Sequence, residues 1–202
     1  MILQFESDHL NDYLSESSEI DYSNAAIAAL ADELYEGGRS ELAYIQAAFE
    51  YVRDRVAHSW DIQGSRVTCA ASDVLHYGEG ICYAKSHLLC ALLRNKGIPA
   101  GICYQRLTLG DTPDTGHVIH ALNAVYISSL NTWIRLDARG NKAGVDAQFS
   151  TEEERLAFSI RDHYGEIDYR VVHAAPHPST IAVLKRYTDV LDMYLNRLPE
   201  QL

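Results

Sequence analysis

The chain has 202 residues, of which 47% are apolar and 22% charged, with 5 prolines. This composition is typical of a globular protein and argues against a disordered, fibrous or membrane-embedded chain. The formal net charge of -11 repels phosphate backbones and anionic lipid heads, so we expect neither a nucleic-acid nor a membrane partner.

A chain of this length fits one domain, and we predict a single domain over residues 1–202, with its core at about 40–150 and helical extensions on both sides. The first residues contain neither a basic segment nor a long apolar run, so we predict no secretory signal. No stretch reaches the roughly 18 consecutive apolar residues that a membrane helix needs. We therefore expect a cytoplasmic protein.

The N-terminal half predicts helices. Residues 23–36 and 40–57 carry apolar side chains in helical spacing, and Gly37-Gly38 separates them. A third helix runs from Cys82 to Lys96 and ends at Gly97. Its LLCALL segment is apolar on every face, so we expect this helix at the centre of the fold.

From residue 100 the pattern changes to strands rich in β-branched and aromatic residues, separated by the turn-forming stretches DTPDTG and SSLN. The predicted strands are residues 100–109, 117–127 and 132–138. They predict an antiparallel sheet packed on the buried helix, which is an α+β fold. After the sheet we expect a loop-rich segment with one short helix at 151–158, and then a single amphipathic closing helix at 180–198.

Four cysteines are too few for a disulfide framework in a chain of this length, and none forms the C-x-x-C pair common in structural zinc sites. We therefore predict no metal and no other cofactor. Three of them are expected to be small core residues: Cys69, Cys90 and Cys103.

Cys82 differs from the other cysteines because it follows Gly80-Ile81 at the start of the predicted buried helix. A thiol is a useful nucleophile only as the thiolate, and a free thiol has a pKa of about 8.5. A helix N-terminus stabilises an anion by about 0.3–1 kcal/mol, up to ~2 when partly buried, and one pKa unit corresponds to about 1.36 kcal/mol. The helix alone therefore lowers the pKa by only about one unit. An imidazolium partner oriented by an acid or amide is needed for more.

His117 and His120 begin the second predicted strand and point to opposite faces, so only one of them can face the helix. Asp137 ends the next strand. A two-residue turn at Ser128-Ser129 would set His120 directly opposite Asp137. Neither serine is the glycine or asparagine that such turns favour, so the turn does not fix the register.

Four phrases of the sequence, taken together, resemble the transglutaminase-like superfamily. They are GIC at 80–82, LLRNKGIPA at 92–100, HALNAVY at 120–126 and WIRLD at 133–137. Their order is the family's order: a Gly-x-Cys helix, a Leu-Leu-Arg phrase, a histidine strand and an aspartate strand. The tryptophan and glutamate that usually follow the histidine are Leu122 and Ala124 here, so we expect a substrate groove that differs from the family's. The ARGNK phrase after the acid is similar to that of bacterial transglutaminase-like proteins described as cysteine proteases.

The resemblance implies a papain-like α+β core in which Cys82, His120 and Asp137 form a catalytic triad for acyl transfer on an amide. Cys82 would attack the carbonyl, His120 would protonate the leaving amine, and Asp137 would hold the imidazole. The substrate would be a peptide, a protein or a small amide. Three neighbours are candidates for oxyanion or substrate contacts: Trp60, Gly80 and Tyr83.

Hydrolysis is the favoured reaction, with two alternatives: transfer to a primary amine, and a non-catalytic binding module suggested by Leu122 and Ala124. We expect Lys85 and Arg139 to be solvated charges or ion-pair partners rather than contacts to an acidic substrate. The sequence does not specify the oligomeric state or the role of the C-terminal segment.

Overall fold

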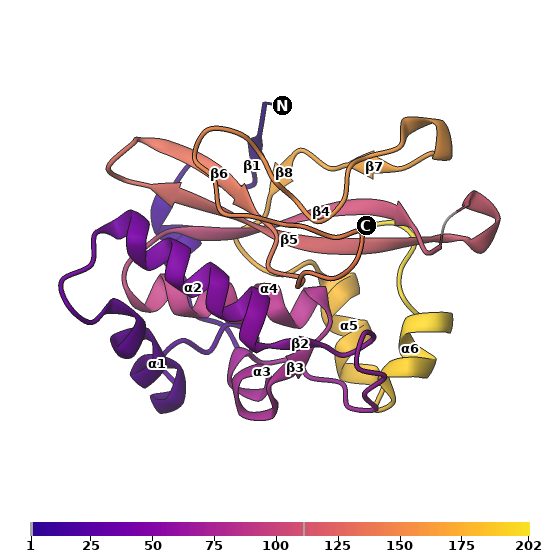
Figure 1. Ribbon diagram of the computed structural model, residues 1–202, viewed down its shortest axis with the longest axis horizontal. Helices are drawn as coiled ribbons and strands as arrows, with labels where there is room; N and C mark the ends of the chain where they lie inside the picture. Colours follow the sequence, from indigo (N-terminus) through magenta and orange to yellow (C-terminus); the bar gives the residue numbers. More distant parts are fainter. Residues whose placement is uncertain (1, 111) are drawn as a thin grey trace.

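A four-stranded antiparallel sheet crosses the molecule in the order β6-β5-β4-β7, as the computed structural model shows (Figure 1). The structure describes residues 2–110 and 112–202, so Met1 and Asp111, the first residue of the predicted DTPDTG turn, lie outside the described part. The strands are β4 (Ala100–Thr108), β5 (His117–Ile127), β6 (Thr132–Leu136) and β7 (Ile167–Asp168). The three strands predicted after residue 100 are thus confirmed.

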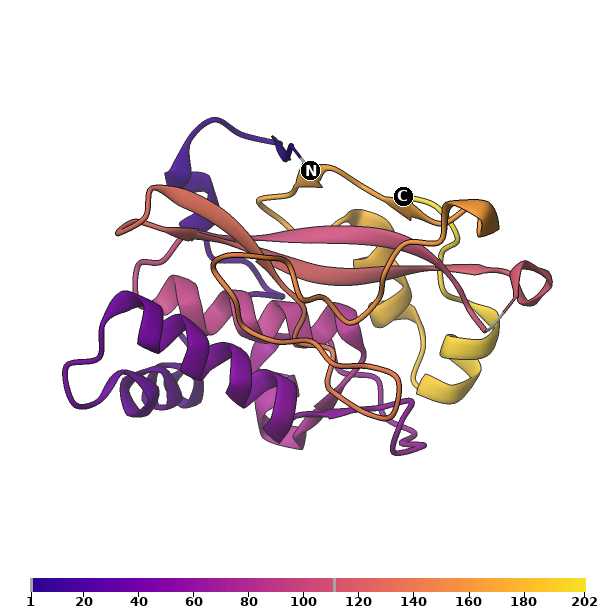
Figure 2. The same ribbon diagram turned by 45° about the horizontal axis from the view of Figure 1, so that its top comes forward.

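Four helices lie together on one face of this sheet (Figure 2). They are α1 (Ala25–Tyr35), α2 (Glu41–Arg55), α3 (Ala71–Tyr77) and α4 (Cys82–Asn95). Helix α4 is buried from Cys82 to Arg94 and contacts β4, β5 and the other three helices. It stops where Gly97 takes a φ of +71°, a conformation that glycine adopts at little cost. The prediction of a central helix followed by a sheet, and hence an α+β fold, is confirmed.

Short elements complete the fold. Strand β1 (Gln4–Phe5) pairs in parallel with β8 (Val171–Val172), and β2 (Ala57–His58) pairs in parallel with β3 (Glu79–Gly80). Three 3-10 turns are η1 (Leu10–Leu14), η2 (Pro113–Thr115) and η3 (Asp162–Tyr164). Within the described residues, no helix is both long enough and apolar enough to cross a membrane.

The second face of the sheet is covered by the N-terminal segment, which crosses it on the side opposite the helices (Figure 2). A small apolar cluster forms there and includes Tyr13, Cys103 and Val172. Leu122 and Ala124 are fully buried in the same cluster. The two departures from the family pattern therefore lie in the core of the protein, and neither lines the cavity described below.

Two predictions after the sheet are wrong. Residues 151–158 form bends and irregular chain rather than a helix. Their backbone groups pair outside the segment, because the carbonyl oxygen of Arg155 accepts the N–H of Gln148 at 2.9 Å and the N–H of Ala157 donates to Asp137. The predicted closing helix is divided into α5 (Pro178–Arg186) and α6 (Val190–Asn196). The Asp189 side chain accepts the backbone N–H groups of the first turn of α6 and so starts a second helix.

Candidate active site

His120 and Asp137 are in direct contact, with 2.8 Å between His120 Nε2 and Asp137 Oδ2. The carboxylate also accepts the backbone N–H groups of Arg139 and Ala157, each at 3.2 Å. Burial would raise the pKa of Asp137, but the positive charge of His120 and these hydrogen bonds hold it below its ordinary value. Asp137 is therefore a buried, ionised acceptor that fixes the orientation of the imidazole.

The strand register that produces this contact differs from the one a two-residue turn would give. Ile127 pairs with Thr132 across a four-residue turn, in which Asn131 takes a φ of +50°. Asparagine tolerates this left-handed conformation, which explains why the longer turn forms. As a result Asp137 lies one residue beyond the end of β6 and reaches His120 from the side rather than from the directly opposed position.

Cys82 is the first residue of α4 and is only 7% exposed. Burial lowers the pKa of His120, but the charges of Asp137 and Cys82 and hydrogen bonds to both raise it to about 10. The structure thus places His120 in contact with Asp137, and Cys82 and His120 line the same cavity. His117 lies elsewhere, with its Nε2 2.9 Å from the carbonyl oxygen of Tyr164, as expected from strand alternation.

A cavity of about 730 Å³ opens onto Cys82 and His120. Its wall includes Trp60, whose indole stacks on the Tyr194 ring of α6 with 4.6 Å between centroids. The segment after α6 closes this side, because the carbonyl oxygen of Pro199 accepts the N–H of Ile119 at 2.9 Å. The C-terminal segment, which the sequence left without a role, therefore forms part of the cavity.

Gly80 and Tyr83 support the site without lining the cavity. A methyl group on Gly80 would stand 3.0 Å from Thr68 Oγ1, so this position has little room for a side chain. The Tyr83 hydroxyl is buried and donates to the carbonyl oxygen of Ile119 at 2.8 Å, which fastens the start of α4 to β5. Of the three predicted accessory residues, only Trp60 faces the cavity.

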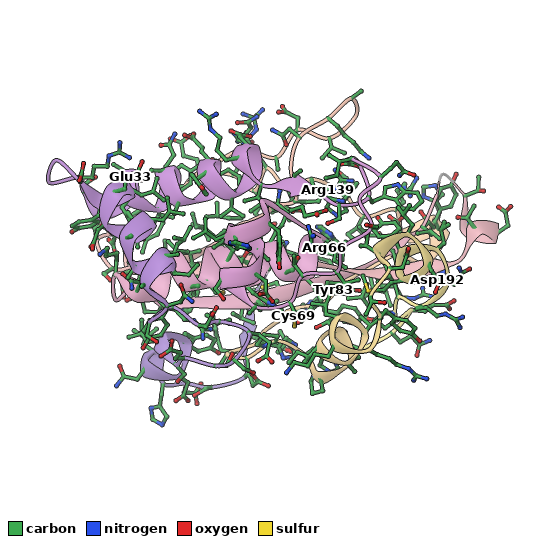
Figure 3. The ribbon with its side chains drawn as sticks, turned by 90° about the horizontal axis from the view of Figure 1, so that it is seen from below. Glu33, Arg66, Cys69, Tyr83, Arg139 and Asp192 are labelled. Carbon is green, nitrogen blue, oxygen red and sulfur yellow. The ribbon has the colours of Figure 1, made fainter. Side chains whose placement is uncertain are left out.

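Three further residues lie near the His120–Asp137 pair, and the sequence did not predict them there. The Phe158 ring meets the His120 ring edge-on, with 5.2 Å between centroids. Arg139, which is labelled in Figure 3, is buried. It pairs with Asp61, so it is an ion-pair partner as predicted, but not a solvated one. Nothing in the spacing of these residues signals their proximity, because long loops carry them to the site.

Lys85 is the largest departure from expectation. It is 1% exposed, and its ammonium donates to the carbonyl oxygen of Val56. Burial, assisted by the charge of Arg139, lowers the pKa of Lys85 to about 7. The signal for its burial was present, because Lys85 lies in a helix predicted to be buried on all sides.

His58 was also missed, although it stands two residues before Trp60 in the sequence. His58 is 5% exposed and lines the same cavity as Cys82. Among the described residues, no group of three or more histidine, cysteine or acidic side chains could hold a metal ion.

A family model described as the transglutaminase-like superfamily matches residues 28–138, which is more than half of the chain. The chain belongs to this superfamily. A similar solved structure is "a putative cysteine protease" from Cytophaga hutchinsonii, with 23% identity and a TM-score of 0.53, covering 66% of this chain and 43% of that one. The periplasmic domain of TgpA from Pseudomonas aeruginosa has 20% identity and a TM-score of 0.45, covering 62% and 45%.

This transglutaminase-like chain therefore spans less than half the length of either solved relative. No curated protein shows significant similarity to it. At this level of identity the likeness to the Cytophaga structure shows the fold alone.

Proposed function

We propose that this transglutaminase-like protein is a thiol enzyme that transfers the acyl group of an amide, with Cys82 as nucleophile, His120 as general acid and base, and Asp137 as the orienting group. Water is the proposed acceptor, which makes the reaction a hydrolysis. The observation that carries the proposal is the buried contact of His120 with Asp137 beside Cys82, at the wall of one cavity.

The contact of His120 with Asp137 supports a separate role for each nitrogen of His120. Because Nε2 is held by Asp137, Nδ1 is left for Cys82. A pKa of about 10 keeps the imidazole protonated at neutral pH, so His120 holds a proton that it can give to a leaving group. When the thiolate attacks an amide carbonyl, the imidazolium gives its proton to the leaving amine. The neutral imidazole then takes a proton from water as the water attacks the thioester.

The form of the cavity favours a peptide or protein amide. One wall of the cavity is apolar. It is formed by Trp60 together with three residues of the C-terminal segment: Tyr194, Leu195 and Leu198. Such a wall suits a side chain or an extended segment next to the scissile bond.

Selective alkylation tests the activated thiol. Burial raises the pKa of Cys69 to about 11, that of Cys103 to about 12, and that of Cys90 as well. Iodoacetamide at pH 6 should therefore modify Cys82 first, and His120→Asn should slow this reaction on the order of tenfold or more. Cys90→Ala, which removes a thiol from the same helix, is the matched control. If all four cysteines react alike, or react only after denaturation, the proposal fails.

A second experiment separates hydrolysis from amine transfer. A peptide library is incubated with the protein in the presence of methylamine, and the products are identified by mass spectrometry. Free carboxylic acids indicate hydrolysis, N-methylamides indicate transfer, and Cys82→Ala should give neither. The alternative of a non-catalytic binding module was suggested by Leu122 and Ala124. Both are core residues away from the cavity, so they give no support to that alternative.

A further inference from the structure

The imidazole of His58 is buried and carries one nitrogen, Nδ1, that is not hydrogen-bonded by the described part of the chain. Its ring lines the cavity next to Cys82 and His120. His58 Nδ1 is fully buried and has no hydrogen-bond partner within residues 2–110 and 112–202. Buried polar atoms in folded proteins are nearly always paired, so an unpaired imidazole in a cavity indicates a ring kept for a ligand.

The backbone holds His58 beside the first turn of α4. In the pairing of β2 with β3, His58 stands opposite Gly80, two residues before Cys82. The N–H of Ser59 donates to the carbonyl oxygen of Gly80 at 3.2 Å. Gly80 has little room for a side chain, which allows this close approach of the two segments.

The N-terminus of α4 points to the kind of ligand. This helix has 14 residues, and no side chain caps its first turn. Its first intrahelical hydrogen bond is from the N–H of Lys85 to the carbonyl oxygen of Ile81. The N–H groups before Lys85, beginning with that of Cys82, thus have no partner inside the helix and, with the helix dipole, favour a negative charge.

The charge state of His58 fits a hydrogen-bond donor to such an anion. Burial, and then the positive charge of Arg139, hold the pKa of His58 well below its ordinary value. The ring is therefore neutral and carries one N–H. The edge of the Tyr194 ring, with 6.0 Å between centroids, packs against it and limits its rotation.

We propose that His58 and the backbone N–H of Cys82 form the oxyanion site of this protein. The inference rests on the proposed acyl transfer at Cys82. As the bond forms between Cys82 Sγ and the substrate carbonyl carbon, the π electron pair moves onto the oxygen, and the two N–H groups donate to that oxyanion. When the pair returns, the bond from carbon to nitrogen breaks, and the amine leaves with the proton of His120. Trp60 is then a wall of the cavity rather than the donor.

The test compares His58→Gln, which keeps a side-chain donor, with His58→Leu, which removes it. Loss of one oxyanion donor typically lowers kcat by a factor of about 10²–10³. We expect a loss of that size in His58→Leu with little change in KM, and a smaller loss in His58→Gln. Iodoacetamide alkylation of Cys82 develops no oxyanion and should proceed at the wild-type rate in both variants. Equal loss of alkylation, or unchanged kcat in His58→Leu, would overturn the inference.

A binding measurement does not depend on turnover. A ¹³C-labelled aldehyde such as N-acetylglycinal adds reversibly to a reactive thiol, and its adduct can be followed by NMR. The adduct should be weakened about 10- to 100-fold by His58→Leu and less by His58→Gln, in proteins whose urea unfolding shows that they are folded. If wild type hydrolyses no amide but shows this dependence, the proposed function fails and the oxyanion site stands. Equal affinity in all three proteins, or no adduct on Cys82, refutes the site.

Discussion

Replacing Lys85 by methionine should change how the stability of the protein depends on pH. Lys85 is one helical turn from Cys82 and almost fully buried. Its pKa is about 7 in the folded protein, against an ordinary value of 10.5 in the unfolded chain. Between these two values the unfolded chain binds more protons than the folded protein, so this lysine makes the folded state more stable as the pH rises.

The size of the effect follows from the same two values. The difference between 10.5 and about 7, at about 1.36 kcal/mol per pKa unit, corresponds to about 5 kcal/mol. Methionine carries no charge and avoids this cost at low pH. It also leaves the carbonyl of Val56 unpaired, which costs about 1–3 kcal/mol at every pH. Lys85→Met should therefore be more stable than wild type at pH 6 by about 2–4 kcal/mol and lose that advantage by pH 10.

His120 acts in the opposite direction. Its folded pKa of about 10 exceeds its ordinary 6.5, so the stability it contributes is fully present below pH 6.5 and is lost as the pH rises toward 10. In wild type the two residues largely offset each other between pH 7 and 10. Without Lys85, the loss of folding stability that His120 causes as the pH rises is no longer offset.

The assay is urea unfolding followed by circular dichroism at several pH values from 6 to 10, with a reducing agent present. Because the other ionisable groups are common to both proteins, their contributions cancel in the difference between the two free energies of unfolding. A difference that stays constant within about 1 kcal/mol over this range would show that Lys85 is not a buried neutral amine, and the reasoning would be refuted.

Two further substitutions test the packing of β4 on β8 and the anchoring of α4 to β5. Gly101→Ala places a methyl 2.5 Å from Val172 Cγ1 and 2.8 Å from the carbonyl oxygen of His173. It should therefore lower the free energy of unfolding by about 1–3 kcal/mol. Wild-type stability in urea would contradict the packing of β4 on β8. Tyr83→Phe leaves the carbonyl of Ile119 buried and unpaired, at a cost of about 1–3 kcal/mol in the same measurement, whereas an unchanged midpoint would mean that the carbonyl finds another donor.

Much of the fold could be predicted because its main helices and strands have clear patterns in their own local sequence. Strand β5 carries a long run of β-branched and aromatic residues between two turn segments, and its observed bounds are the predicted ones. Helix α4 is apolar on all sides and ends before Gly97, so both its position and its burial could be predicted. The candidate site followed from the same elements, because Cys82 opens the helix and His120 lies in the strand that packs on it.

The errors occurred where a contact distant in sequence decides local structure. The 151–158 segment has helical composition, but Gln148 and Asp137, which lie outside it, bind its backbone groups. The hairpin register depends on the left-handed conformation of Asn131, which the preceding serines do not signal. His58 could not be recognised, because only the folded chain brings β2 beside the start of α4.

The stacking of Trp60 on Tyr194 gives the cavity its own fluorophore. The chain contains two tryptophans, and the other, Trp133, packs against Phe5 and Tyr13 on the opposite face of the sheet. In a Trp133→Phe background the tryptophan emission of the protein would come from Trp60 at the cavity wall alone. Ligand binding in the cavity could then be followed by tryptophan fluorescence, without a labelled ligand and before any substrate is known.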